Sequence, residues 1–239
     1  MLINYKFNKT AVKILLGSFI IGNTLLNANT SNDFTLSENE QKVYGNMINE
    51  DLKALINSGK TIFSKIINFT VVSADTIQKD YEKNEIFADE KYKNKILIVD
   101  GKIKSINKDM FNNAYLSLYG GKNQFINPQA QFKNGHISWL SKLSSNQKVK
   151  IVCYSSRMIG GMAYLKDCIP SDVWIDDTTK EIIDNSEKLS KNENLNIKKM
   201  IDFVKLVTQK LPEKSSCFKD SSNSSCIKEI EKIFSSMKK

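Results

Sequence analysis

Hydrophobic residues recur with a helical period in the first part of the chain and with a strand period in the middle. Between about residues 37 and 92 they fall on single helical faces, which predicts packed helices. Ser37 and Glu40 have the spacing of a capping box at the start of the first helix. A second helix is expected to begin near Ser73 or Asp75. The apolar positions of the two helices are Val43, Met47, Leu52, Leu55 and Ile56, then Ile77, Tyr81 and Ile86.

Alternation of hydrophobic and polar residues begins at Ile96 and predicts strands. The core parity of the first strand is occupied by Leu97, Val99, Gly101 and Ile103. A glycine inside a strand marks a bulge or bend, so we expect this strand to pass from one sheet layer to the next at Gly101. A second strand is expected over Ala114 to Leu118 and a third over residues 125–132. Pro128 limits the third strand to an edge or a bulge.

The later elements complete a five-stranded barrel. Ile137, Trp139, Leu140 and Leu143 indicate a short helix, and Val149, Ile151 and Cys153 indicate a fourth strand. A fifth strand is expected from Met162 to Asp167, with residues 157–161 as the turn before it. Three strands, a short helix and two further strands is the chain order of the OB fold, a Greek-key barrel.

The chain returns to a helical period after about Ser171. The two stripes are Ile197, Met200, Ile201, Val204, Val207 and Leu211, then Ile227, Ile230, Ile233 and Phe234. Pro212 ends the first stripe, and a serine-rich loop between Cys217 and Cys226 would join the two helices as a hairpin. The stripes fit a packed core, with a partner helix or a membrane surface as the alternative.

The expected fold class is α+β: an OB-fold Greek-key barrel with N-terminal helices and a C-terminal helical hairpin. We expect four divisions of the chain. These are a signal peptide at 1–28, an N-terminal helical segment at 29–92, the barrel at 93–170 and a C-terminal helical extension at 171–239.

The first 28 residues have the form of a bacterial secretory signal peptide. Three lysines precede an apolar run over residues 14–26, and Ala28 offers a small residue for cleavage. The run is short for a bilayer span, and an uncleaved anchor is the alternative. No cysteine that could carry a lipid follows the run directly. We therefore expect a periplasmic or secreted protein.

Basic residues exceed acidic ones by 35 to 26, and Arg157 is the only arginine. Sites that clamp phosphates or carboxylates commonly use the planar arginine fork. The lysine-rich balance therefore favours a solvated surface over a nucleic-acid groove.

The four cysteines all lie in the second half of the chain. Because an exported chain meets oxidising conditions, we expect them to pair. Of the three connectivities, the two local ones are favoured, Cys153 with Cys168 and Cys217 with Cys226. A zinc site is disfavoured because there is no C-x-x-C motif and His136 is the single histidine. We predict no metal and no cofactor.

The sequence contains no motif of a known catalytic class, such as G-x-S-x-G, a Walker loop, G-x-G-x-x-G or H-E-x-x-H. Two pairs of neighbouring acids, Asp176 with Asp177 and Glu82 with Glu85, are more typical of solvated faces than of an acid and base pair. A cell-wall or glycan hydrolase that uses Asp176 or Asp177 is the alternative. We expect no catalytic residues and no enzyme activity.

OB folds generally bind ligands on the exposed face of their second and third strands. In this chain that face would carry Tyr115, Tyr119, Asn127, Gln129 and Gln131. Tyrosine rings can stack on sugars or bases, and amides form hydrogen bonds without net charge. Because these positions hold no cation, a protein, peptide or glycan is favoured over a phosphate backbone. Coverage of the face by the C-terminal helices is the alternative.

Several segments in order resemble a known family. They are Asn84, Glu85, Ala88, Asp89, Tyr92 and Lys93, then the Val-Asp-Gly-x-Ile strand, residues 123–132, and the hairpin that ends Leu165-Lys166-Asp167-Cys168. Over residues 75–169 the chain is similar to the tRNA-anticodon-like OB-fold family of exported bacterial proteins, many of them described as lipoproteins. The resemblance implies an OB barrel with a leading helix, and it implies no common biochemical activity. The chain departs from the family by its C-terminal tail and by lacking a lipidation cysteine.

The sequence thus predicts a non-enzymatic exported binding module, with an envelope protein, a peptide or a glycan as the favoured partner. The alternative function is binding of single-stranded oligonucleotides, for which salt-dependent affinity is expected.

Overall fold

The computed structural model describes residues 35–59, 69–132, 136–186, 195–219 and 224–237. The chain falls into two compact units, which are treated separately. The strand unit comprises residues 67–174, and the helical unit comprises residues 1–66 with 175–239. The expected signal peptide, residues 1–28, lies outside the described residues.

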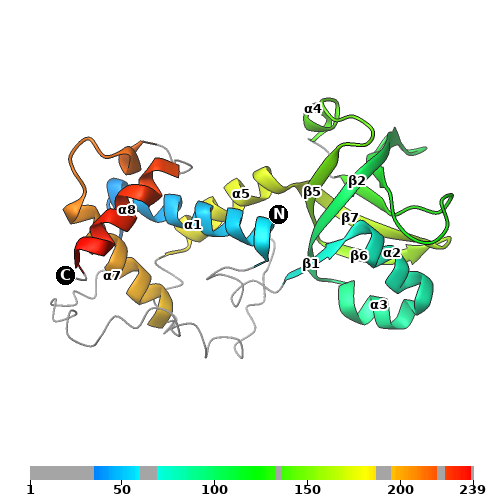
Figure 1. The fold of residues 1–239 in the computed structure, drawn as a ribbon, viewed down its shortest axis with the longest axis horizontal. Coiled ribbons are helices and arrows are strands. Elements are labelled where there is room, and N and C mark those ends of the chain that lie inside the picture. Colours follow the sequence, from blue (N-terminus) through cyan, green and yellow to red (C-terminus); the bar gives the residue numbers. More distant parts are fainter. Residues whose placement is uncertain (1–34, 60–68, 133–135, 187–194, 220–223, 238–239) are drawn as a thin grey trace. The chain divides into compact units, whose positions relative to one another are not determined.

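In its described residues, the strand unit is a seven-stranded mixed sheet with three helices (Figure 1). In chain order its elements are β1 (Phe69–Ser73), α2 (Ala74–Lys83), α3 (Glu85–Tyr92), β2 (Ile96–Lys108), β3 (Ala114–Leu118), β4 (Gln129–Phe132), α4 (Ile137–Leu140), β5 (Lys148–Cys153), β6 (Ser155–Ile159) and β7 (Met162–Pro170). Helices α2 and α3 lie together on one side of the strands, away from α4. The predicted α+β class is confirmed.

The pairings of five strands form a closed circuit. β2 pairs with β3, β3 with β4, β4 with β7, β7 with β5, and β5 again with β2. The β4–β7 pairing is parallel and the other four are antiparallel. Two further strands extend the circuit: β1 pairs in parallel with β2, and β6 pairs with β7.

Those two strands were not predicted. β1 lies in the stretch that the sequence analysis assigned to helices, because five residues between two helical patterns give no clear strand period of their own. β6 occupies most of the stretch expected to be a turn. Only Gly160 and Gly161 turn there, both with positive φ, and the strand before them pairs with β7 from Ser155 to Ile159.

Two predicted strands also differ in their details. The third was expected over residues 125–132, but β4 begins only at Gln129. Side-chain bonds hold the preceding residues as a loop, in which Asn123 Oδ1 accepts from the Phe125 amide at 2.9 Å. The bend in β2 is not at Gly101 itself, since the register shifts between Ile103 and Ser105. Gly101 instead permits close packing, because a Cβ there would lie 3.0 Å from Leu118 Cδ1.

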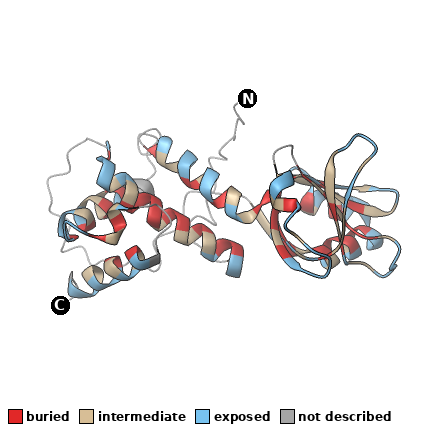
Figure 2. Ribbon diagram, turned by 90° about the horizontal axis from the view of Figure 1, so that it is seen from above, coloured by how far each residue is buried: buried red, intermediate tan, exposed pale blue. Residues whose placement is uncertain are grey.

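The core of the strand unit lies inside the circuit of strands, under α2 and α3 (Figure 2). Its largest contributors include Leu97, Val99, Ile103, Leu116, Leu118, Ile151 and Leu165, with Ile77, Tyr81 and Tyr92 from the two helices. A disulfide joins Cys153 of β5 to Cys168 of β7 within this core, which is the connectivity that the spacing favours. The opposite face of β2 and β5 is also buried at Ile98 and Val152, so the first half of β2 and the last half of β5 are apolar on both sides.

The helical unit contains α1 (Glu38–Ser58), most of α5 (Ser171–Asp184), α7 (Leu195–Lys210), the short helix η2 (Ser216–Phe218) and α8 (Ser224–Met237). The predicted capping box at Ser37 and Glu40 is present at the start of α1. α1 packs against α7, α8 and η2. The amphipathic stripe of α1 therefore faces the C-terminal helices, whereas α2 and α3 belong to the strand unit.

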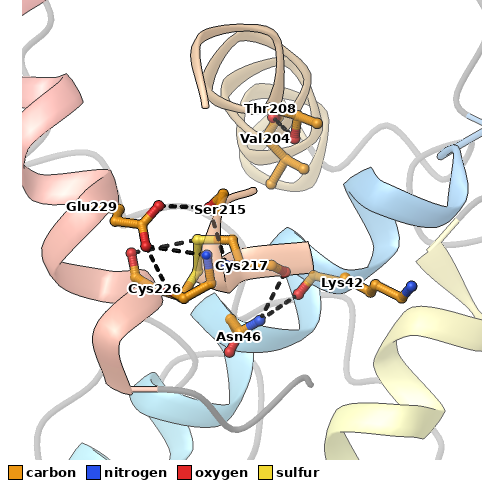
Figure 3. The surroundings of a disulfide bond; sticks show 9 residues. Lys42, Asn46, Val204, Thr208, Ser215, Cys217, Cys226 and Glu229 are labelled. Carbon is orange, nitrogen blue, oxygen red and sulfur yellow. Dashed lines mark hydrogen bonds between the residues drawn. A yellow bond between two sulfur atoms is a disulfide. The ribbon is translucent and has the colours of Figure 1, made fainter. Parts of the chain in front are cut away.

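A second disulfide joins Cys217 of η2 to Cys226 of α8 (Figure 3). On one side, the Glu229 carboxylate accepts from the hydroxyls of Ser215 and Ser216, both at 2.6 Å. On the other side, Asn46 of α1 donates to the carbonyl of Cys217 at 3.4 Å. The disulfide thus lies between hydrogen-bonded polar groups of α1 and of α8.

Candidate ligand-binding face

The strand registers place polar side chains in a row across five strands. Direct partners link Ser105 of β2, Ser117 of β3, Gln129 of β4, Tyr164 of β7 and Arg157 of β6. Their neighbours Leu116, Ala130 and Leu165 point into the core, so the row points outward. A second outward row runs beside the first, from Asn107 through Tyr115 to Gln131. These two rows are called the outer face below.

Only some of the predicted binding residues lie on this face. Tyr115, Gln129 and Gln131 lie together on the outer face and are partly exposed. Tyr119 follows the end of β3 and is exposed, with the Lys102 ammonium 5.5 Å from its ring centroid. Asn127 is only 6% exposed, and its amide donates to the Gln124 carbonyl at 3.0 Å. Asn127 therefore stabilises the β3–β4 loop and does not belong to the exposed face.

Five residues of the outer face were missed from the sequence: Ser105, Asn107, Ser117, Arg157 and Tyr164. The Arg157 guanidinium lies 5.6 Å from the ring centroid of Tyr164, across the β6–β7 pair. Partial burial raises the pKa of the Tyr164 phenol, and the adjacent Arg157 charge opposes that rise. The alternation along β7 already gives Tyr164 an outward parity. Arg157 could not be assigned to the face while its strand was taken for a turn.

The β2–β3 loop borders the outer face and is held by Asp109. The Asp109 carboxylate accepts from the side-chain amide of Asn113 at 2.9 Å and from its backbone N–H at 2.8 Å. It also accepts from the Phe111 amide at 2.9 Å, and these bonds lower the pKa of Asp109. The loop exposes Met110 and Phe111, with 89% and 78% of their surfaces accessible. Two large apolar side chains are thus presented at one end of the face.

Helix α2 holds the turn after β6 and the loop after β3. Gln78 is fully buried, and its amide donates to the Gly161 carbonyl and accepts from the Ala163 amide, both at 2.8 Å. Asp75 accepts from the Gly121 amide at 3.1 Å. Gly120 packs so closely that a Cβ there would lie 2.8 Å from the Asp75 Cα. The turn after β6 and the loop after β3 are therefore both tied to α2.

Comparison with known proteins gives a family. The sequence model of the tRNA_anti-like family matches residues 6–169, well over half of the chain. The chain belongs to the tRNA_anti-like family. The resemblance found in the sequence is thereby confirmed.

Among solved structures, the chain is similar to a "putative nucleic acid-binding lipoprotein" from Klebsiella pneumoniae, with 16% identity and a TM-score of 0.34. The similarity covers 42% of this chain and 91% of that one. A search of curated proteins found no match.

The acidic residues considered as catalytic candidates in this tRNA_anti-like protein, and its histidine, are not brought together in one site. The Asp176 carboxylate accepts from the amide of Asn49 at 3.3 Å, and Glu82 accepts from the Lys122 backbone amide at 3.2 Å. His136 precedes α4 without capping it through its side chain. Over the described ranges, no three His, Cys, Asp or Glu side chains gather as a metal site. In the same residues, no helix has the length and apolar character needed to span a membrane.

Proposed function

We propose that this tRNA_anti-like protein is an exported, non-enzymatic binding module that holds a peptide or a glycan on the outer face. We also infer that the closed circuit β2–β3–β4–β7–β5 is a five-stranded barrel of OB type, because its strand order and its helix before β5 match that fold.

The chemistry of the outer face carries this proposal. Its centre consists of hydroxyl and amide groups, Ser117, Gln129 and Gln131, flanked by the rings of Tyr115 and Tyr164. Amides and hydroxyls can both donate and accept, as a peptide backbone or a sugar requires. Tyrosine rings add apolar contact area with few rotatable bonds. The face therefore suits an extended, neutral, polar ligand.

A binding role is favoured over a catalytic one because the charged groups Arg157, on the face, and Asp109, beside it, are already engaged. Asp109 is bonded within its own loop, and Arg157 lies against Tyr164. A general acid or base has to reach the substrate with its proton, and these groups are used to position their neighbours.

The two disulfides support export. Disulfides persist in the periplasm and outside the cell, and are reduced in the cytosol of most bacteria. Identification of the amino terminus of the protein isolated from its host would test whether the leader is removed.

A binding screen tests the function. The purified exported chain is titrated with extended peptides and with cell-wall oligosaccharides, and binding is measured by calorimetry. We expect Tyr115→Ala with Gln131→Ala to weaken any ligand found by about tenfold or more, since one stacking contact and one hydrogen bond are lost. The control is Phe87→Ala, which removes an exposed aromatic ring from α3. Equal affinity in all three proteins would contradict the proposal.

A single-stranded oligonucleotide is the second candidate for the outer face, favoured by Arg157 beside Tyr164. Bases could stack on the ring while the guanidinium contacts a phosphate. This alternative predicts affinity that falls steeply with salt, whereas a neutral ligand predicts almost no salt dependence.

A further inference from the structure

A pair of lysines faces each other on the β2–β5 pairing, outside the outer face. Lys102 and Lys148 are direct cross-strand partners. Gly101 and Ile103 on either side of Lys102 point into the core, so both lysines point outward. Like charges directly opposite each other destabilise a sheet. The sequence therefore retains an unfavourable pair at this position.

Among the residues that the structure describes, no carboxylate lies within ion-pair distance of these two lysines. The ion pairs found among the described residues do not include Lys102, Lys104 or Lys148. The ammonium group of Lys104, in the β2 bulge, donates a hydrogen bond to the Gln124 carbonyl at 2.6 Å. On the same sheet face the next cross-strand pair is Asp100 with Lys150, so the positive charge exceeds the negative charge.

Two exposed aromatic rings accompany the lysines. Tyr119 is 44% exposed, and Lys102 lies over its ring. Phe125 is 82% exposed and follows Gln124, the residue to which Lys104 is bonded. The bond from Lys104 therefore holds the β3–β4 loop, with Phe125, beside β2. Tyr119 therefore lies beside Lys102, and the residue before Phe125 is bonded to Lys104.

We propose that Lys102, Lys104, Lys148, Tyr119 and Phe125 form a binding site for single-stranded nucleic acid, named the lysine surface. The ammonium groups contact phosphates, and the two rings stack on bases. From Lys148 to Tyr119 the surface crosses two strand spacings, about 10 Å, which a few nucleotides can span. Lysines act as point charges suited to a flexible backbone. The site goes beyond the proposed function, because none of its residues belongs to the outer face and its ligand is charged rather than neutral.

Anisotropy of a fluorescein-labelled ten-residue oligothymidylate, measured with the full purified chain between about 50 and 200 mM salt, tests this site. Three phosphate contacts predict a slope of about −2 for log K against log salt. Lys102→Gln with Lys148→Gln should reduce the slope to about −0.7 and weaken binding about tenfold. Phe125→Ala should weaken binding by about 5- to 100-fold and leave the slope unchanged.

The matched control is Lys83→Gln with Lys166→Gln, which removes the same charge from exposed positions on α2 and β7. We expect it to change affinity less than twofold. The double lysine variant should melt at the same or a higher temperature than the parent, because it loses a like-charge pair. This separates a loss of binding from a loss of folding.

Several results would overturn the lysine surface. They are the absence of binding at the lowest salt, an equal loss in the control variant, and a Phe125→Ala variant that binds like the parent. Preference for a labelled oligoglutamate would show an acidic peptide as the ligand instead. Oligothymidylate binding that is lost only in Tyr115→Ala with Gln131→Ala would assign nucleic acid to the outer face. Failure of the peptide and glycan screen alone would leave the lysine surface intact.

Discussion

The strand unit and the helical unit differ in how their buried polar groups are satisfied. In the strand unit, buried Gln78 and Ser156 are both hydrogen bonded, as is the phenol of Tyr81. In the described part of the helical unit, three buried side-chain oxygens have no hydrogen-bond partner: Tyr44 Oη, Asn49 Oδ1 and Thr179 Oγ1. Directional bonds to a few defined partners therefore specify the strand unit. The helical unit leaves these buried oxygens unpaired and depends more on apolar packing.

The largest effects are expected from the two disulfides. Replacing Cys217 and Cys226 together by alanine should destabilise the helical unit by about 3 kcal/mol, from the entropy of a loop of about ten residues in the unfolded chain. Hydrogen exchange should report faster opening of η2 and α8 and unchanged exchange in β2 and β7. Replacing Cys153 and Cys168 together by alanine should instead give faster exchange in β2 and β7 and unchanged exchange in η2 and α8. If removing either disulfide lowered the exchange protection of both units, the contrast between the units would be contradicted.

The next effect concerns Gln78, which supports the strand unit from α2. Gln78→Ala leaves the Ala163 amide and the Gly161 carbonyl without their partner, which should lower the free energy of unfolding by about 2 kcal/mol. Urea denaturation measures this loss. The control is Gln147→Ala, whose side chain accepts one bond at an exposed position and should change stability by less than about 1 kcal/mol. An equal effect of the two changes would show that α2 does not hold the β6–β7 turn in place.

Local patterns predicted the elements whose stabilising contacts lie close in sequence. The capping box at Ser37 and the alternating strand from Ala114 need no knowledge of distant residues. β6 was missed because its pairing with β7 is decided by a two-residue turn, and Gly160 with Gly161 suggested a longer one. Asn127 was placed on the outer face by parity, but a loop has no parity, and its side-chain bond decides its burial.

Long-range partners could not be predicted in the same way. The apolar stripe of α1 indicates that one helical face is buried, and it carries no information about which element covers that face. For the same reason the row that ends at Arg157 became visible only when the strand registers were known. Outward parity identifies candidate residues, and cross-strand pairing assembles them into a site.

A matched pair of tyrosines tests the contrast between the units most directly. Burial raises the pKa of both the Tyr44 and the Tyr81 phenol. Tyr81 is hydrogen bonded to Asp89 at 3.1 Å and to Ser156 at 2.8 Å, whereas the Tyr44 hydroxyl has no partner among the described residues. Tyr81→Phe should destabilise the protein by about 1 kcal/mol, because buried Ser156 loses its partner. Tyr44→Phe removes an unsatisfied hydroxyl and should be neutral or stabilising by up to about 1 kcal/mol. Thermal melting compares the two variants, and the same sign of change in both would contradict the contrast.

The smallest effect is a response of the helical unit to acid. Hydrogen bonds from Ser215 and Ser216 lower the pKa of Glu229 in the folded protein. A group with a lowered folded pKa contributes stability above its unfolded pKa, near 4.5, and loses that contribution as pH falls through the folded value. We therefore expect exchange of the η2 and α8 amides to quicken relative to β2 and β7 as the pH falls below about 4.5. Glu229→Gln should remove this difference, since its side chain does not titrate, and a persistent difference would assign the acid response to another carboxylate.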